Sequence, residues 1–147
     1  MADFFATSRS NYVLVKDVTA AIEALKGFDI PIHRHPKNAN AIMLAGCHAN
    51  GTFSSSYVDE SGDEIHLDLA EWASTHLVEG QVIVLVSAGA EKLRYISAWA
   101  EAYTWKGEVV TVDLLTSLFS RLQSELGIAP SEVADPSYLN LYEGASA

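Results

Sequence analysis

Apolar residues recur at intervals of three or four along three segments of the chain, and an aspartate precedes each segment. This spacing places apolar side chains on one stripe of an α-helix, and the aspartate can accept hydrogen bonds from N–H groups of the first turn. The segments run between three pairs of residues: Asp17 and Gly27, Asp68 and Gly80, and Asp113 and Gly127. Their stripes are Val18, Ala21, Ile22 and Leu25; Leu69, Trp72, Ala73 and His76; and Leu115, Leu118, Phe119, Leu122 and Leu126. The pattern predicts three helices.

Short runs of β-branched and aromatic residues, separated by turn residues, predict the strands. The predicted ranges are 11–15, 29–35, 39–47, 52–58, 64–67, 81–87, 93–104 and 108–112. This order of strands and helices is typical of an α+β fold, with a mainly antiparallel sheet and three helices mostly on one face. The length favours a single α+β domain over residues 1–127. Residues 128–147 are predicted to form a partly packed C-terminal tail.

The two long predicted strands differ in their side-chain patterns. Residues 81–87 are apolar on both faces, which is typical of a central strand covered on both sides. Residues 93–104 alternate, with an alanine-rich side that suits close packing of a helix. The opposite side carries Tyr95, Trp99 and Tyr103. These three residues form a possible second interface if no helix covers them.

Charge is distributed unevenly along the chain. The net charge is −10, and no lysine or arginine stands between Lys37 and Lys92. Eight carboxylates lie in that interval, and six of them form the predicted partner-binding surface: Asp59, Glu60, Asp63, Glu64, Asp68 and Glu71. A negative surface repels nucleic acid and anionic membranes but attracts basic protein surfaces. We therefore expect a protein partner and no direct binding to nucleic acid or membrane.

Signatures of common reaction chemistry are missing from the sequence. It contains no C-x-x-C, H-E-x-x-H, phosphate-loop or nucleophile-elbow pattern, so we expect no catalytic residues, no metal and no cofactor. His33, His35 and His48 could still line a pocket of a small enzyme or ligand-binding protein. Cys47 is the only cysteine, and the N-terminus lacks the pattern of a signal peptide. Both features favour a cytoplasmic location.

Two segments resemble motifs found in other proteins. They are Ala6-Thr-Ser-Arg-Ser-Asn-Tyr-Val-Leu-Val-Lys-Asp17 and Gly89-Ala-Glu-Lys-Leu-Arg-Tyr95. They are similar to the motifs A-T-x-R-S/T-N-Y-F-x-V and G-x-E-K-L-R-Y of small uncharacterised proteins of plasmids, integrative elements and phages. Val13 stands where that pattern has Phe. The resemblance implies a mobile-element context, in which small acidic proteins often inhibit host defence.

Three functional hypotheses follow from these observations. The first is a non-enzymatic inhibitor, of the anti-CRISPR or anti-restriction kind, whose carboxylates block a basic groove on a host defence complex. The second is a homo-oligomeric structural or regulatory module, a possible homodimer, whose acidity serves solubility. The third is the small enzyme or ligand-binding protein with the histidine-lined pocket. Partner capture, sedimentation and metal analysis distinguish the three.

Overall fold

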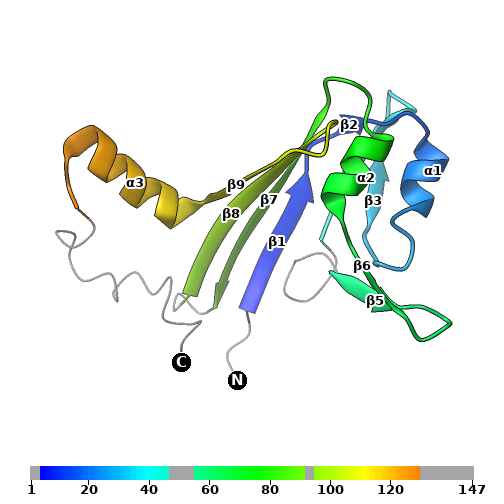
Figure 1. Cartoon of the computed structure of the whole chain (residues 1–147), viewed down its shortest axis with the longest axis horizontal. Helices are drawn as coiled ribbons and strands as arrows, with labels where there is room; N and C mark the ends of the chain where they lie inside the picture. Colours follow the sequence, from blue (N-terminus) through cyan, green and yellow to red (C-terminus); the bar gives the residue numbers. More distant parts are fainter. Residues whose placement is uncertain (1–3, 47–54, 92–94, 130–147) are drawn as a thin grey trace.

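The computed structural model describes residues 4–46, 55–91 and 95–129 (Figure 1). Three helices and nine strands lie in these ranges. The strands are β1 (Phe4–Ser10), β2 (Val13–Leu14), β3 (Ile32–Arg34), β4 (Ala41–Leu44), β5 (Ser56–Val58), β6 (Glu64–His66), β7 (Val82–Glu91), β8 (Tyr95–Thr104) and β9 (Val109–Asp113). The helices are α1 (Val18–Glu23), α2 (Leu69–His76) and α3 (Leu114–Leu126). The α+β class expected from the sequence is confirmed.

Each helix begins at the aspartate that the sequence predicts. The Asp17 carboxylate accepts a hydrogen bond from Ala20 N at 3.0 Å, and that of Asp68 accepts one from Glu71 N at 2.9 Å. Asp113 caps α3 in the same way through Thr116 N at 3.0 Å. These bonds satisfy N–H groups that have no partner within the helix. Gly127 ends α3 in the left-handed conformation, with φ of 68°.

All strand pairs in the described ranges are antiparallel, and they divide into three sheets. The largest has the order β1-β7-β8-β9, the second β2-β4-β3, and β5 and β6 form a hairpin. The central position expected for residues 81–87 is confirmed, because β7 lies between β1 and β8. Strand β1 was not predicted. The strand expected over residues 11–15 is reduced to β2, since the chain bends between the two sheets.

The hydrophobic core lies between the large sheet, the second sheet and the first two helices. Its fully buried side chains include Ile42 and Leu44 of β4, and Ile83 and Leu85 of β7. Trp72 of α2 is also buried, and its indole Nε1 donates a hydrogen bond to the carbonyl of Ala21 in α1 at 3.0 Å. Helices α1 and α2 therefore pack into one core with the inner face of the large sheet.

The sequence predicts that both faces of residues 81–87 are covered and that a helix packs on the alanine-rich side of residues 93–104. Both predictions are wrong. Tyr103 is on the inner side of β8, where it is half-buried and packs against the core. The alanine-rich side is the outer one, and Val86 opposite Ala100 is 51% exposed. Strand β7 is thus buried on one face only. Helix α3 follows β9 directly and extends away from the rest of the molecule (Figure 1), so no described helix packs along the alanines.

Candidate functional site

The predicted acidic residues lie on the β5–β6 hairpin and the first turn of α2. Asp59 organises the hairpin turn, because its carboxylate accepts hydrogen bonds from the N–H groups of Ser61 and Asp63, both at 2.9 Å. Gly62 takes the left-handed conformation within this turn, with φ of 87°. These constraints present Glu60 and Asp63 to solvent on a defined loop.

The six carboxylates have few partners of opposite charge. Within the described ranges, none of them forms an ion pair with a lysine or arginine. Glu64 lies 3.8 Å from Nε2 of His66, and it accepts a hydrogen bond from the Ser56 hydroxyl at 2.8 Å. The negative charge is therefore largely uncompensated by neighbouring side chains. Such a surface attracts cations most strongly at low ionic strength.

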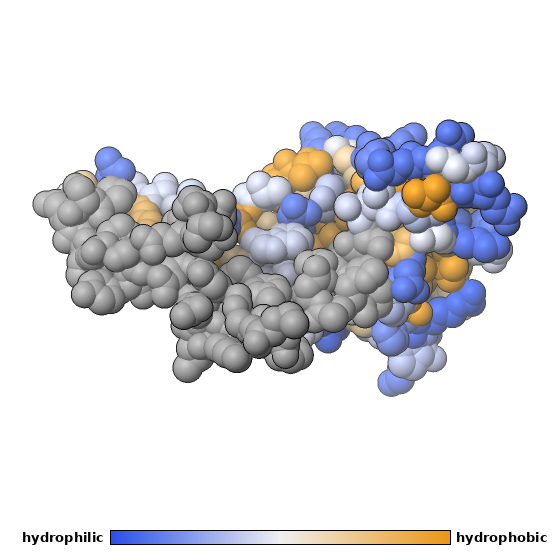
Figure 2. Space-filling view, turned by 90° about the horizontal axis from the view of Figure 1, so that it is seen from below, coloured by the Kyte–Doolittle hydropathy of each residue, from blue (hydrophilic) through white to orange (hydrophobic). Residues whose placement is uncertain are grey.

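A groove of about 300 Å³ lies beside the hairpin, between α1, β6 and α2. Its apolar lining includes Leu25, Phe28 and Trp72, which belong to the core. Asp68 and Glu71 of α2 also line it and are exposed. Viewed from below, the end of the molecule that carries these elements is mainly hydrophilic with small hydrophobic areas between (Figure 2). The groove thus combines apolar walls with two carboxylates.

The hairpin is held against the groove by an aromatic contact. The rings of Phe28 and Tyr57 meet edge to face, with centroids 4.8 Å apart. Gly27 has φ of 95°, and a Cβ atom at this position would lie 2.6 Å from the Tyr57 ring. Glycine is therefore required for both backbone conformation and space. This contact fixes the acidic hairpin relative to α1.

His66 and His76 also line the groove. Burial lowers the pKa of His76, and the nearby positive charge of Lys16 lowers it further, against an opposing effect of Asp17. His76 thus favours the neutral form. His76 therefore lies in the groove beside the carboxylates of Asp68 and Glu71 without opposing them with a positive charge of its own.

This arrangement suits the side chain of an arginine or lysine. The aliphatic stem of either residue can pack against the more exposed apolar lining, Ile65 and Leu67, while its charged head meets a carboxylate. An arginine can also make two parallel hydrogen bonds to one carboxylate.

The structure places the other predicted site residues apart from this groove. Trp99 and Tyr103 lie on the inner side of β8, and the Tyr103 hydroxyl donates a hydrogen bond to Glu101 at 2.5 Å. Both are half-buried, which limits the contact they can offer to a partner. The side chain of Tyr95 lies outside the described residues.

The described histidines are not gathered into one site. No group of three His, Cys, Asp or Glu side chains in the described part of the chain is arranged to hold a metal ion. His35 is engaged by the backbone N–H of Lys37 at 3.1 Å and by the Tyr12 ring, at a centroid distance of 4.9 Å. His48 and Cys47 are outside the described ranges.

Sequence reasoning predicted the carboxylates but missed the groove beside them. Leu25 and Trp72 lie on the predicted helix stripes, whereas Phe28 lies on none of them. The sequence signal available was the apolar Phe28 directly after Gly27, because a hydrophobic residue often packs back after a left-handed glycine. The lining comes from segments more than thirty residues apart, so only the tertiary fold brings it together.

Comparisons with protein-family models, with curated proteins and with solved structures gave no match to this chain. None of the helices in the described ranges has both the length and the apolar character needed to span a membrane.

Proposed function

We propose that this protein is a small acidic binding protein that occupies a basic, nucleic-acid-binding groove of another protein. The motif resemblance suggests the context of a mobile genetic element. The partner would then be a host defence complex, and inhibition would be of the anti-CRISPR or anti-restriction kind. The function is non-enzymatic, and its location is cytoplasmic.

The observation that carries this proposal is the set of uncompensated carboxylates beside an apolar groove. Glu60, Asp63 and Glu71 are exposed, and their carboxylates form no ion pair or hydrogen bond within the described part of the chain. Asp59 and Asp68 use their carboxylates to fix the local backbone. The site thus offers anionic groups on an ordered scaffold, which lowers the entropy lost on binding.

Binding would compete with nucleic acid for the same basic residues. The negative field accelerates encounter with a basic groove, and salt screens this attraction. An arginine or lysine that enters the groove beside Ile65 adds apolar contact to the charge pairing. The hairpin carboxylates supply further charge pairs, each worth about 0.2–1 kcal/mol when exposed.

The test begins with capture of a partner from host lysate, followed by measurement of affinity at several salt concentrations. The test variant replaces Asp59, Glu60, Asp63 and Glu64 by Asn or Gln. A matched control replaces Glu23, Glu79, Glu108 and Glu125 by Gln, which removes the same charge outside the site. We expect the test variant to lose one to several kcal/mol of binding free energy, roughly, and to show a flatter salt dependence.

The control variant should lose much less affinity, because none of its carboxylates lines the groove. Nucleic acid should displace this protein from the wild-type complex. Equal losses in the two variants would show that only net charge matters, and an unchanged affinity in the test variant would show that the hairpin is not the interface. Capture of a partner without a nucleic-acid-binding groove would also contradict the proposal.

A further inference from the structure

The outer face of the large sheet is apolar across three strands. Strand register aligns Val86, Ala100 and Val112 in one row, and it aligns Val84, Ala102 and Val110 in the next. Each row has alanine on β8 between valines on β7 and β9. Val110 is 62% and Val112 is 46% exposed. A contiguous apolar surface of this kind marks an interaction site.

The small alanine side chains form the floor of a trough along β8. A groove of about 190 Å³ lies at this face, and its lining includes Val86, Ala98, Ala100, Val112 and Leu114. Strands β7 and β9 lie two strand spacings apart, about 10 Å. This separation matches the width of an α-helix, which is about 10 Å with its side chains. The trough is therefore shaped for a helix.

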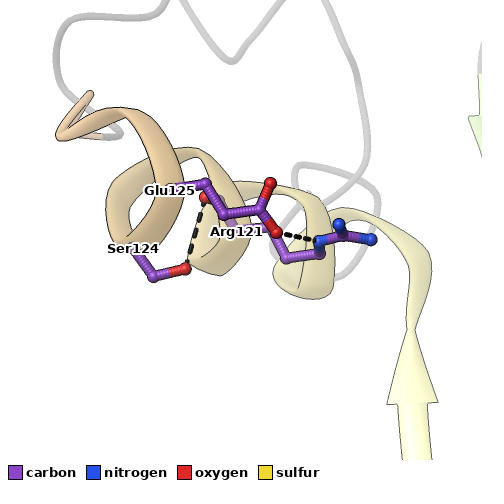
Figure 3. A network of polar contacts seen from close by, with 3 residues as sticks. All are labelled: Arg121, Ser124 and Glu125. Carbon is purple, nitrogen blue, oxygen red and sulfur yellow. Dashed lines mark hydrogen bonds and ion pairs between the residues drawn. The ribbon is translucent and has the colours of Figure 1, made fainter.

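Helix α3 carries an apolar ridge that would fill such a trough. Leu114, Leu118, Leu122 and Leu126 recur at every fourth residue, and Leu118 is 51% exposed. Arg121 and Glu125 stand three and seven residues after Leu118, so their ion pair, at 2.7 Å, borders this ridge (Figure 3). The Ser124 hydroxyl donates to the Arg121 carbonyl at 3.3 Å. The helix is thus amphipathic, although Leu114, Leu118 and Leu126 are exposed.

The helix cannot fill the trough of its own chain. Helix α3 starts at Leu114, directly after Asp113 of β9, so no loop allows it to turn back over the sheet. Only Leu114, its first residue, reaches the groove. The remainder extends beyond the sheet (Figure 1).

We infer that the occupant is helix α3 of a second copy of this chain, in a two-fold symmetric dimer. Each copy offers one trough and one helix, which meets the self-complementarity that such a dimer requires. The face also allows two acidic copies to approach each other without bringing carboxylates together. Two copies of charge −10 repel each other, and the valine and alanine positions of β7, β8 and β9 carry no ionisable residue; Arg9 of β1 lies beside them, opposite Val86.

The dimensions are sufficient for a specific dimer. A helix of 13 residues is about 20 Å long, and six residues of a strand span the same length. A helix and a trough of this size on each copy together bury roughly 1,000 Å² or more, which reaches the range of specific interfaces. This inference concerns a surface other than the acidic groove and does not depend on the proposed function.

Sedimentation of the full chain over a range of concentrations tests the dimer. We expect a dimer that becomes stronger as salt rises, because salt screens the repulsion between two acidic copies. Ala100→Glu and Leu118→Glu should each weaken dimerisation by at least about tenfold. Gln123→Glu adds the same charge to the exposed polar side of α3 and should have much less effect.

Disulfide trapping tests the arrangement in chains that are fully folded. In a Cys47→Ser background, chains with Ala100→Cys are mixed with chains carrying either Leu118→Cys or, as control, Ser124→Cys. We expect a crosslink between different chains in the first mixture and little in the second. A monomer at all concentrations up to about 100 µM would overturn the proposal, including the case in which residues 130–147 occupy the trough. Dimers that persist unchanged in both glutamate variants would overturn it as well.

Discussion

The side-chain amide of Asn11 takes the place of a backbone pair opposite Val84. Its Oδ1 accepts a hydrogen bond from Val84 N at 2.8 Å, and its Nδ2 donates to the carbonyl of Val82 at 3.0 Å. The chain bends at this point, between β1 in the large sheet and β2 in the second sheet. The amide therefore supplies hydrogen-bond partners to the N–H of Val84 and the carbonyl of Val82 in β7, where the chain after β1 bends away from the large sheet. This gives a physical role to Asn11 in the first motif.

Replacement of Asn11 by alanine should destabilise the fold by about 1–3 kcal/mol. Two hydrogen bonds are lost, each with a net value of about 0.5–1.5 kcal/mol. Denaturant titration measures the change. Gln123→Ala is the control, because Gln123 is exposed on α3 and its loss should change stability by less than about 0.5 kcal/mol. Equal effects would show that Asn11 does not hold the bend.

Local signals in the sequence were sufficient for the helices but not for the sheet. Asp17, Asp68 and Asp113 cap helices because their hydrogen bonds are made within three residues. Strand β1 has no comparable local pattern, and it forms by pairing with β7 about eighty residues later. Alternation along β8 showed which side chains share a face, but it carried no information on which face meets the core.

For the candidate site, the sequence predicts the cluster of carboxylates but not the groove beside it. Asp59 to Glu64 are adjacent in sequence and share one hairpin, so their clustering follows from a local turn. The groove beside them needs Leu25 and Trp72 to meet across separate elements. Such contacts depend on the global fold, and no motif in the chain encodes them.

Ser8 and Ser87 form a buried pair between β1 and β7, which a double-mutant cycle can test. The Ser8 hydroxyl donates to Ser87 Oγ at 2.8 Å, and both residues are at most 3% exposed. Either single alanine variant leaves one buried hydroxyl without this partner, at a cost of about 1–3 kcal/mol. The double variant should cost clearly less than the sum of the two. Additive losses would show that the hydroxyls act independently.

Leucines of the core and of α3 should respond differently to truncation. Leu85 is 1% exposed, so Leu85→Ala should cost about 2–5 kcal/mol. The unbroken stripe of α3 suggests a similar value for Leu118, but half of this residue is exposed, so we expect less than about 1 kcal/mol for the monomer. Unfolding of each variant at low and high protein concentration measures this. A large effect of Leu118→Ala that does not vary with concentration would contradict the dimer.

His76 should make stability depend on pH in the mildly acidic range. Its pKa in the folded protein is lowered, chiefly by burial, below the ordinary value of 6.5. The unfolded chain therefore binds a proton more readily than the folded chain as pH falls through that value. Stability from this residue is present above about pH 6.5 and is lost below it. His76→Gln should reduce this loss in denaturant titrations between neutral and mildly acidic pH. An unchanged pH dependence of stability in the variant would show that His76 does not cause the loss.

The packing of Gly27 against Tyr57 allows the position of the acidic hairpin to be tested separately from its charge. Gly27→Ala places a Cβ atom 2.6–2.8 Å from the Tyr57 ring, which must then move off Phe28. Gly80→Ala is a matched control, because Gly80 has a similar φ of 85° but no atom within 4 Å of the new Cβ. Both variants carry the cost of a left-handed alanine, about 1 kcal/mol. The clash at Gly27 should add about 1–3 kcal/mol.

Adding Tyr57→Ala to Gly27→Ala removes the clash, so the double variant should be more stable than the sum of the single effects predicts. Partner affinity should fall in Gly27→Ala although every carboxylate remains, because the hairpin and the groove no longer keep their relative positions. Gly80→Ala should bind as the wild type does. If Gly27→Ala and Gly80→Ala match in both unfolding and binding, the Tyr57 contact does not position the hairpin. The site would then depend on charge alone.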